Sequence, residues 1–342
     1  MSLFHGPEHF SVFGVSIRTT GFASPILETD GAPSPARSSL QLSVHAVLRQ
    51  VVLSAAFLLP ALFAGGFLRA EAVAETPWQR IVVIGASASA GFNTGREAGR
   101  TANIARIIEA MLKVDHDKVV NVSSGFFFMN PRWMGTQSVR RAVEVKATLV
   151  VAIDFLFWFG YGPKSEERRL EDLDAGLQYL AGLKCPILLS RIPDMKASVG
   201  KMLSARQVPR PETLEKLNKR INAWASERKN VVMVPMAEFV DDLRAGKGVS
   251  VSDIVYPPGS IRKLLQRDEL HPTLEGLAAV TALSFIKFCE SNKKVSVDDF
   301  ERRPLVIRER VIAAIRAAKK RPGKLPAKEA LSGDSKESEK DG

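Results

Sequence analysis

Five short apolar runs, separated by longer amphipathic segments, constrain the fold of this chain more than any other feature of its sequence. Each run consists mostly of β-branched residues or leucine, and together they cover residues 80–84, 118–122, 148–153, 186–190 and 231–235. Nearly continuous hydrophobicity is typical of strands buried on both faces of a parallel sheet. Alternation of such strands with helices predicts a doubly wound α/β sandwich with right-handed crossovers.

The segments between the runs carry apolar residues three and four positions apart, as amphipathic helices do. We expect helices over residues 101–113, 168–183, 211–228 and 273–289. Thr273 stands where it can cap the last of these helices, and Pro272 restricts the entry to it. A further amphipathic segment, residues 305–318, favours one more helix near the C-terminus.

Composition divides the 342 residues into three parts. Residues 1–74 hold an N-terminal extension and then an uncharged stretch, 51–68, followed by small-residue cleavage sites. That pattern indicates a secretory signal peptide and predicts a periplasmic or secreted protein, with a membrane anchor over 51–68 as the alternative. Residues 75–300 form the α/β domain, and 301–342 form a basic helix and a tail that we expect to be disordered.

The net charge of +11 does not predict a nucleic-acid partner, because no basic run is interleaved with aromatic residues. The basic tail or the N-terminal apolar segment could instead associate with a membrane or envelope. Cys185 and Cys289 have no zinc-site spacing, so no metal site is expected. Both adjoin apolar segments, which favours two buried thiols, although an exported protein could pair them.

Ser87 follows the first predicted strand directly, within the small-residue stretch 85–91. Open α/β sheets place ligands at the carboxyl ends of their strands, so this serine is a candidate nucleophile. A dinucleotide-binding loop is the competing interpretation. The glycine spacing does not match that motif, and the second strand ends without the carboxylate that would hold a ribose.

His271 is the best candidate for the base that a nucleophilic serine requires. Three of the five histidines, His5, His9 and His45, fall in the N-terminal part, and His116 precedes the second strand, at the opposite edge of the sheet. Asp268 stands three residues before His271, so one loop ahead of the last helix supplies both a base and a carboxylate to orient it.

Three sequence blocks resemble those of the SGNH/GDSL hydrolase superfamily. Residues 85–91, Gly-Ala-Ser-Ala-Ser-Ala-Gly, resemble its Gly-Asp-Ser-x-Ser-x-Gly block, and residues 268–272, Asp-Glu-Leu-His-Pro, resemble its last block. Residues 121–125, Asn-Val-Ser-Ser-Gly, are similar to its second block, which implies that the Gly125 N–H donates to the oxyanion. The resemblance covers about residues 79–291. It implies a flavodoxin-like three-layer α/β/α sandwich with about five parallel strands, and a serine esterase with Ser87, Asp268 and His271 as catalytic residues and no metal or cofactor.

Two positions depart from the family pattern. Ala86 replaces the aspartate of the first block, and Asp154 stands where the family has an oxyanion-binding asparagine. An ionised carboxylate only accepts hydrogen bonds, whereas a good oxyanion donor contributes ~3 kcal/mol to the transition state. Asp154 is therefore either protonated and donating, or turned away toward another role such as binding substrate, or the mark of an impaired enzyme.

The sequence thus predicts an exported hydrolase that acts on an acyl ester of a small molecule, glycan or lipid. The alternative is a catalytically impaired module of the same fold that binds an envelope glycan or acyl ligand. Two aromatic stretches, 126–134 and 155–161, follow the second and third strands and either line a substrate cleft or pack in the core.

Overall fold

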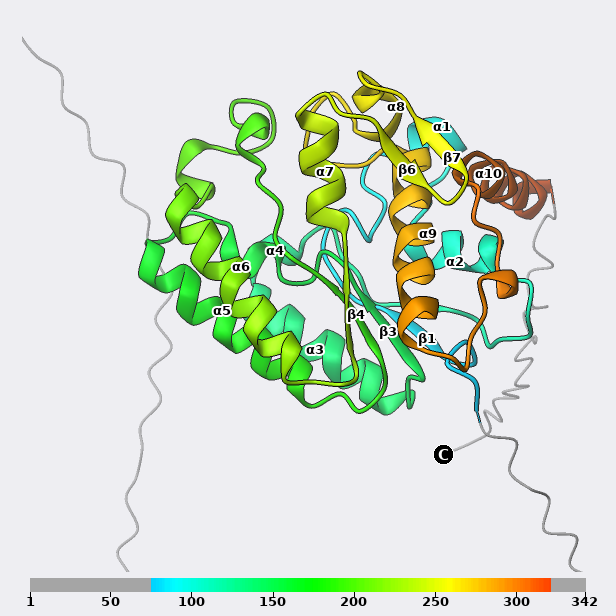
Figure 1. Ribbon diagram of the computed structural model, residues 1–342, viewed down its shortest axis with the longest axis horizontal. Helices are drawn as coiled ribbons and strands as arrows, with labels where there is room; N and C mark the ends of the chain where they lie inside the picture. Colours follow the sequence, from blue (N-terminus) through cyan, green and yellow to red (C-terminus); the bar gives the residue numbers. More distant parts are fainter. Residues whose placement is uncertain (1–74, 321–342) are drawn as a thin grey trace, which may run out of the picture. The chain divides into compact units, whose positions relative to one another are not determined.

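The computed structural model describes residues 75–320. Its central sheet has five parallel strands in the order β2-β1-β3-β4-β5 (Figure 1). The strands are β1 (Ile81–Val83), β2 (Val120–Asn121), β3 (Leu149–Ala152), β4 (Ile187–Ser190) and β5 (Val231–Val234). This is the flavodoxin-like strand order. The predicted fold class is confirmed, and every predicted strand is present.

Helices cover both faces of the sheet, which makes the three-layer sandwich (Figure 1). One layer contains α3 (Pro131–Glu144), α5 (Glu166–Ala181) and α6 (Pro211–Ser226). The other contains α2 (Ile104–Met111), α9 (Leu274–Ser291) and α10 (Pro304–Lys320). The strands between the layers are short and rich in β-branched residues, and β1, β3 and β4 are buried along their whole lengths.

Shorter elements connect the strands and helices of these layers. The helical ones are α1 (Gly95–Ala98), α4 (Phe157–Gly160), α7 (Met236–Arg244) and α8 (Ile261–Leu264), with 3-10 turns η1 (Phe127–Met129), η2 (Lys196–Ser198), η3 (Ala205–Gln207) and η4 (Val297–Asp299). An antiparallel hairpin of β6 (Val249–Val251) and β7 (Ile254–Tyr256) follows α7. The sequence did not predict this hairpin, because three-residue strands are too short to give a periodic signal.

Helix α10, which the sequence placed outside the α/β domain, packs against α2 and α9. Its apolar face is buried through Ile307, Val311 and Ile315. The loop before it is also attached, because the Glu301 N–H donates to the carbonyl of Met111 at 2.8 Å. The core of the sandwich therefore extends past residue 300.

The predicted signal peptide or anchor and the predicted disordered tail lie outside the described residues. Among residues 75–320, no helix is both long and apolar enough to cross a membrane. Cys185 and Cys289 are both free thiols. Both are half-buried rather than fully buried as the sequence favoured, and this burial raises the pKa of each to about 11, which disfavours the reactive thiolate.

Candidate active site

Ser87, His271 and Asp268 meet at the carboxyl edge of the sheet. Ser87 Oγ lies 2.8 Å from His271 Nε2, and His271 Nδ1 lies 2.8 Å from Asp268 Oδ2. The serine comes from the loop after β1, and the other two residues come from the loop before α9. The structure thus brings together the three side chains that the sequence proposed as nucleophile, base and orienting carboxylate.

The loop before α9 folds around Asp268. Its Oδ1 accepts hydrogen bonds from the backbone N–H groups of Leu270 (2.9 Å) and His271 (3.0 Å), while Oδ2 faces the imidazole. Burial alone would raise the pKa of Asp268, but the hydrogen bonds from His271 and Leu270 outweigh it and lower the pKa. An ionised Asp268 accepts a hydrogen bond from the Nδ1–H group and leaves Nε2 unprotonated, so that Nε2 can accept a hydrogen bond from Ser87.

Two residues that sequence reasoning missed hold the imidazole in place. The ring of Phe92 stacks on His271, with centroids 4.2 Å apart. Gln266 Nε2 donates to the carbonyls of Phe92 (2.8 Å) and Pro272 (2.7 Å), which ties the histidine loop to the serine loop. No local pattern marks Phe92 or Gln266, because their partners are distant in sequence or depend on the folded loop.

Asp154 lies at the end of β3 and turns toward the serine loop. Its Oδ1 accepts from the Ala86 N–H (3.0 Å) and from Ser89 Oγ (2.5 Å), and its Oδ2 accepts from the Ser89 N–H (3.1 Å). Burial raises the pKa of Asp154, and these hydrogen bonds partly offset the increase. Of the three roles that the sequence left open for Asp154, these contacts fit a carboxylate turned away from the oxyanion: Asp154 is an acceptor that braces the loop around Ser87.

Gly85 is required by this brace. Its φ of +152° lies in a region that side chains disfavour, and a Cβ built on it would come within 2.1 Å of Asp154 Oδ1. The glycine thus lets the carboxylate approach the loop backbone. Ser89, the second serine of the Ser-x-Ser pattern, completes the brace, so the sequence contained a signal for its importance but not for its partner.

Two backbone N–H groups near Ser87 remain available for an oxyanion. The ladder between β1 and β2 continues past the strands, because the Ser124 N–H donates to the carbonyl of Gly85 at 3.1 Å. This contact places Gly125 beside the serine loop. Within the described residues, no hydrogen bond uses the N–H of Ser87 or of Gly125.

An apolar cavity of about 50 Å³ opens beside Ser87 and His271. Its walls come from the ends of β3 and β4 and from α7, α8 and α9. Besides Ser87 and His271, Asp154 is the only polar residue that lines it, within the part of the chain described. The cavity can accept an apolar group of a molecule held at the serine.

Across residues 75–320, no group of three or more His, Cys, Asp or Glu side chains is arranged to hold a metal ion.

The two aromatic stretches differ in how far their side chains are buried. Side chains of 155–161 are buried, so this stretch packs in the core, and only Phe157 among its aromatic residues reaches the cavity. In the first stretch Phe127 is buried, whereas Phe126 and Trp133 are well over half exposed.

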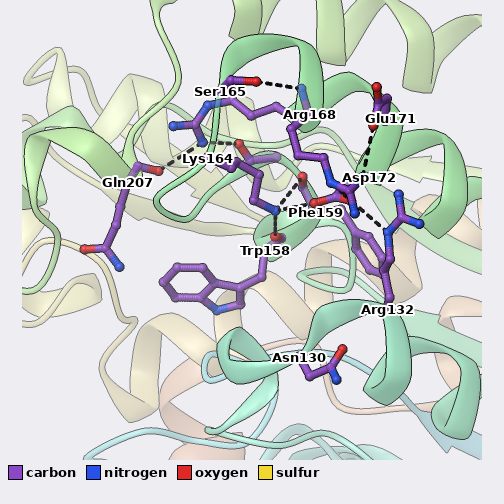
Figure 2. A network of polar contacts seen from close by, with 12 residues as sticks. Asn130, Arg132, Trp158, Phe159, Lys164, Ser165, Arg168, Glu171, Asp172 and Gln207 are labelled. Atoms are coloured by element: carbon purple, nitrogen blue, oxygen red, sulfur yellow. Dashed lines mark hydrogen bonds and ion pairs between the residues drawn. The ribbon is translucent and has the colours of Figure 1, made fainter. Parts of the chain in front are cut away.

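A polar network holds the helix that carries Phe157. Lys164 Nζ donates to the carbonyl of Trp158 (3.1 Å) and to Asp172 (2.7 Å), and Figure 2 shows its ammonium group between them. Asp172 also accepts from Arg132 of α3 at 2.8 Å. Burial would raise the pKa of Asp172, but hydrogen bonds from Lys164 and Arg132 lower it. The network therefore ties α3, α4 and α5 together.

Neither a protein-family model nor a curated protein sequence matches this chain. Among solved structures, TesA is 17% identical over 63% of this chain and 100% of its own, with a TM-score of 0.37. A GDSL-like lipase from Bacteroides thetaiotaomicron is 14% identical over 63% of this chain and 90% of its own, with a TM-score of 0.39. A carbohydrate esterase family 3 structure from Talaromyces cellulolyticus is 12% identical over 64% of this chain and 100% of its own, with a TM-score of 0.37.

Proposed function

We propose that this protein is a serine esterase that hydrolyses an acyl ester through Ser87, His271 and Asp268. The observation that carries the proposal is the continuous chain of two 2.8 Å contacts from Ser87 Oγ through the imidazole to Asp268. Nucleophile, base and orienting carboxylate within hydrogen-bond reach are the geometric requirement for acyl transfer to a serine.

The reaction follows from these contacts. Ser87 Oγ attacks the ester carbonyl carbon while His271 Nε2 takes the hydroxyl proton, and ionised Asp268 stabilises the resulting imidazolium. The imidazolium then gives the proton to the departing alcohol oxygen. Water, activated by the same nitrogen, hydrolyses the acyl-serine and regenerates the site.

The oxyanion would be stabilised by the backbone N–H groups of Ser87 and Gly125. In support, both are free of other hydrogen bonds in the described chain, and Ser124, the neighbour of Gly125, donates to Gly85 of the serine loop. Backbone donors fixed before the reaction stabilise developing charge without reorganising. Asp154 supports this arrangement indirectly, by holding the loop through Ala86 and Ser89.

Labelling of the full-length protein with a fluorophosphonate, followed by peptide mapping, tests the proposal. We expect the label on Ser87, and p-nitrophenol release from short acyl esters that disappears in Ser87→Ala. Ser226→Ala is a matched control, because Ser226 is exposed near the end of α6. Failure to label Ser87, together with no Ser87-dependent turnover, would contradict the esterase assignment and favour a non-catalytic acyl-binding module.

We also propose that the esterase is exported, with residues 51–74 as its signal peptide. The support is the sequence pattern alone: an uncharged stretch between Arg49 and Arg69, followed by small residues. N-terminal sequencing of the mature protein from the native host should then give a start near residue 75. A mature protein that retains residues 51–68 would favour the membrane anchor instead.

A further inference from the structure

The cavity beside Ser87 has the composition of a site for an uncharged aliphatic group. Residues around its interior include Ile153, Met195, Met236, Val240 and Leu277. No Lys, Arg or Glu lines it within the described chain. A carboxylate or ammonium group on the acyl chain would therefore be buried without a partner, which costs several kcal/mol.

Asp154 does not change that conclusion. Although this residue borders the cavity, its two carboxylate oxygens are engaged by Ala86 and Ser89 of the serine loop. The polar boundary of the cavity is thus the catalytic end, where Ser87 and His271 lie. A substrate that enters can place its carbonyl at Ser87 and direct an apolar chain inward.

We propose that this cavity binds the acyl chain of the substrate and limits the acyl group to about two to four carbons. The inference rests on the proposed esterase function and names its substrate class. The cavity volume of about 50 Å³ sets the length of the acyl chain. An engineered protein cavity of roughly 150 Å³ holds benzene, so each carbon needs ~25 Å³. The cavity therefore accommodates about two carbons beyond the carbonyl carbon, which stays at Ser87.

The walls of the cavity are tied to one another, so the limit on chain length is built into the fold. Arg244, at the end of α7, donates to Met195 Sδ at 2.8 Å and to the carbonyl of Glu269 at 2.5 Å. These contacts link α7, the loop after β4 and the histidine loop. Met236, the first residue of α7, is the wall residue best suited to substitution, because its side chain is long, unbranched and only half-buried.

Chain-length profiles of the full-length protein test this inference. The rate of p-nitrophenyl acetate, butyrate and hexanoate hydrolysis is measured per active site, counted by titration with a short-chain fluorophosphonate. We expect kcat/KM for hexanoate to be at least tenfold below that for butyrate. Met236→Ala removes three heavy atoms and adds about 75 Å³ on the same scale, which is enough for the five carbons of a hexanoyl chain beyond the carbonyl, so the hexanoate-to-butyrate ratio should rise at least fivefold.

Met233→Ala is the matched control, since Met233 lies three residues earlier, on β5, and does not line the cavity. Its ratio should stay within twofold of the wild-type value. Titratable Ser87 with hexanoate turnover equal to or faster than butyrate turnover, or the same change of ratio in both variants, would overturn the chain-length inference and leave the esterase intact. A protein without titratable Ser87 would overturn both.

Discussion

Replacing Asp154 with asparagine separates two opposite roles for this residue. If it is a failed oxyanion donor, the amide restores a donor and the reaction accelerates. If it braces the serine loop, as its contacts with Ala86 and Ser89 indicate, the amide lowers both the stability of the protein and kcat. Asparagine has one acceptor oxygen, so in either orientation its NH₂ group faces a backbone N–H that Asp154 now accepts from.

The loss of stability expected for Asp154→Asn follows from the burial of Ala86 and Ser89. Ser89 is fully buried, and Ala86 is only 1% exposed, so water cannot replace a lost acceptor at either N–H. An unsatisfied buried donor costs ~1–3 kcal/mol. For a domain of this size, about 2 kcal/mol lowers the melting temperature by roughly 4–8 °C. Because Ser87 lies between the two braced residues, we expect its displacement to reduce kcat by about 10- to 100-fold.

Calorimetry or urea unfolding measures the stability loss, and p-nitrophenyl butyrate hydrolysis measures kcat. Asp174→Asn serves as the control, because Asp174 is exposed on α5 and pairs with Arg220 at the surface. We expect it to change stability by less than about 0.5 kcal/mol. Faster turnover in Asp154→Asn with unchanged stability would refute the brace, and would place residue 154 at the oxyanion after all.

Two further perturbations test how the loop before α10 and the loop that carries His271 are attached to the domain. A hydrogen bond from Arg303 lowers the pKa of buried Glu301 to about 2, from an ordinary value of 4.5. The ionised carboxylate therefore stabilises the folded protein fully above about pH 4.5, and this contribution is lost as pH falls through 2. Glu301→Gln should lower the free energy of unfolding by about 2 kcal/mol at pH 6, after allowance for solvent screening, and by little at pH 2. Exposed Glu309→Gln is the control for these urea titrations, and equal losses at both pH values would contradict this assignment. Gln266→Ala removes two hydrogen bonds, so it should lower the free energy of unfolding by ~1–3 kcal/mol and lower kcat, because the loop that carries His271 becomes less fixed. A wild-type kcat in this variant would show that other contacts hold the loop.

The sequence singled out Ser87, Asp268 and His271 as candidates because each is marked by a local feature. Ser87 lies in the loop after β1, which has a strand on either side, and Asp268 and His271 share one turn before a capped helix. Parallel strands bring their carboxyl ends to one edge, so residues 184 positions apart meet there. Hydrophobic patterning specified β1, β3 and β4 most clearly, because these strands are buried along their whole lengths between the helix layers.

The direction of Asp154 was not predictable from its surroundings in the sequence. Phenylalanine and tryptophan follow it, which suggested a desolvated carboxyl, and burial does raise its pKa. Its orientation depends instead on donors at Ala86 and Ser89, more than 60 residues earlier in the chain. The cavity walls were not predicted either, since Met236 and Val240 belong to α7, a nine-residue amphipathic helix that the sequence reasoning did not identify.

The contacts of Asp154 also explain how the chain can lack an acidic residue at position 86. The serine loop presents the N–H groups of Ala86 and Ser89 to the protein interior, and they require an acceptor wherever it originates. A carboxylate arriving from β3 meets that need, but it uses the position from which a third oxyanion donor would come. Losing one such donor costs about 10²–10³ in kcat. We therefore expect an esterase that relies on the Ser87 and Gly125 N–H groups to be slower by about that factor than one with three donors, while its acyl-enzyme chemistry and its preference for short chains remain intact.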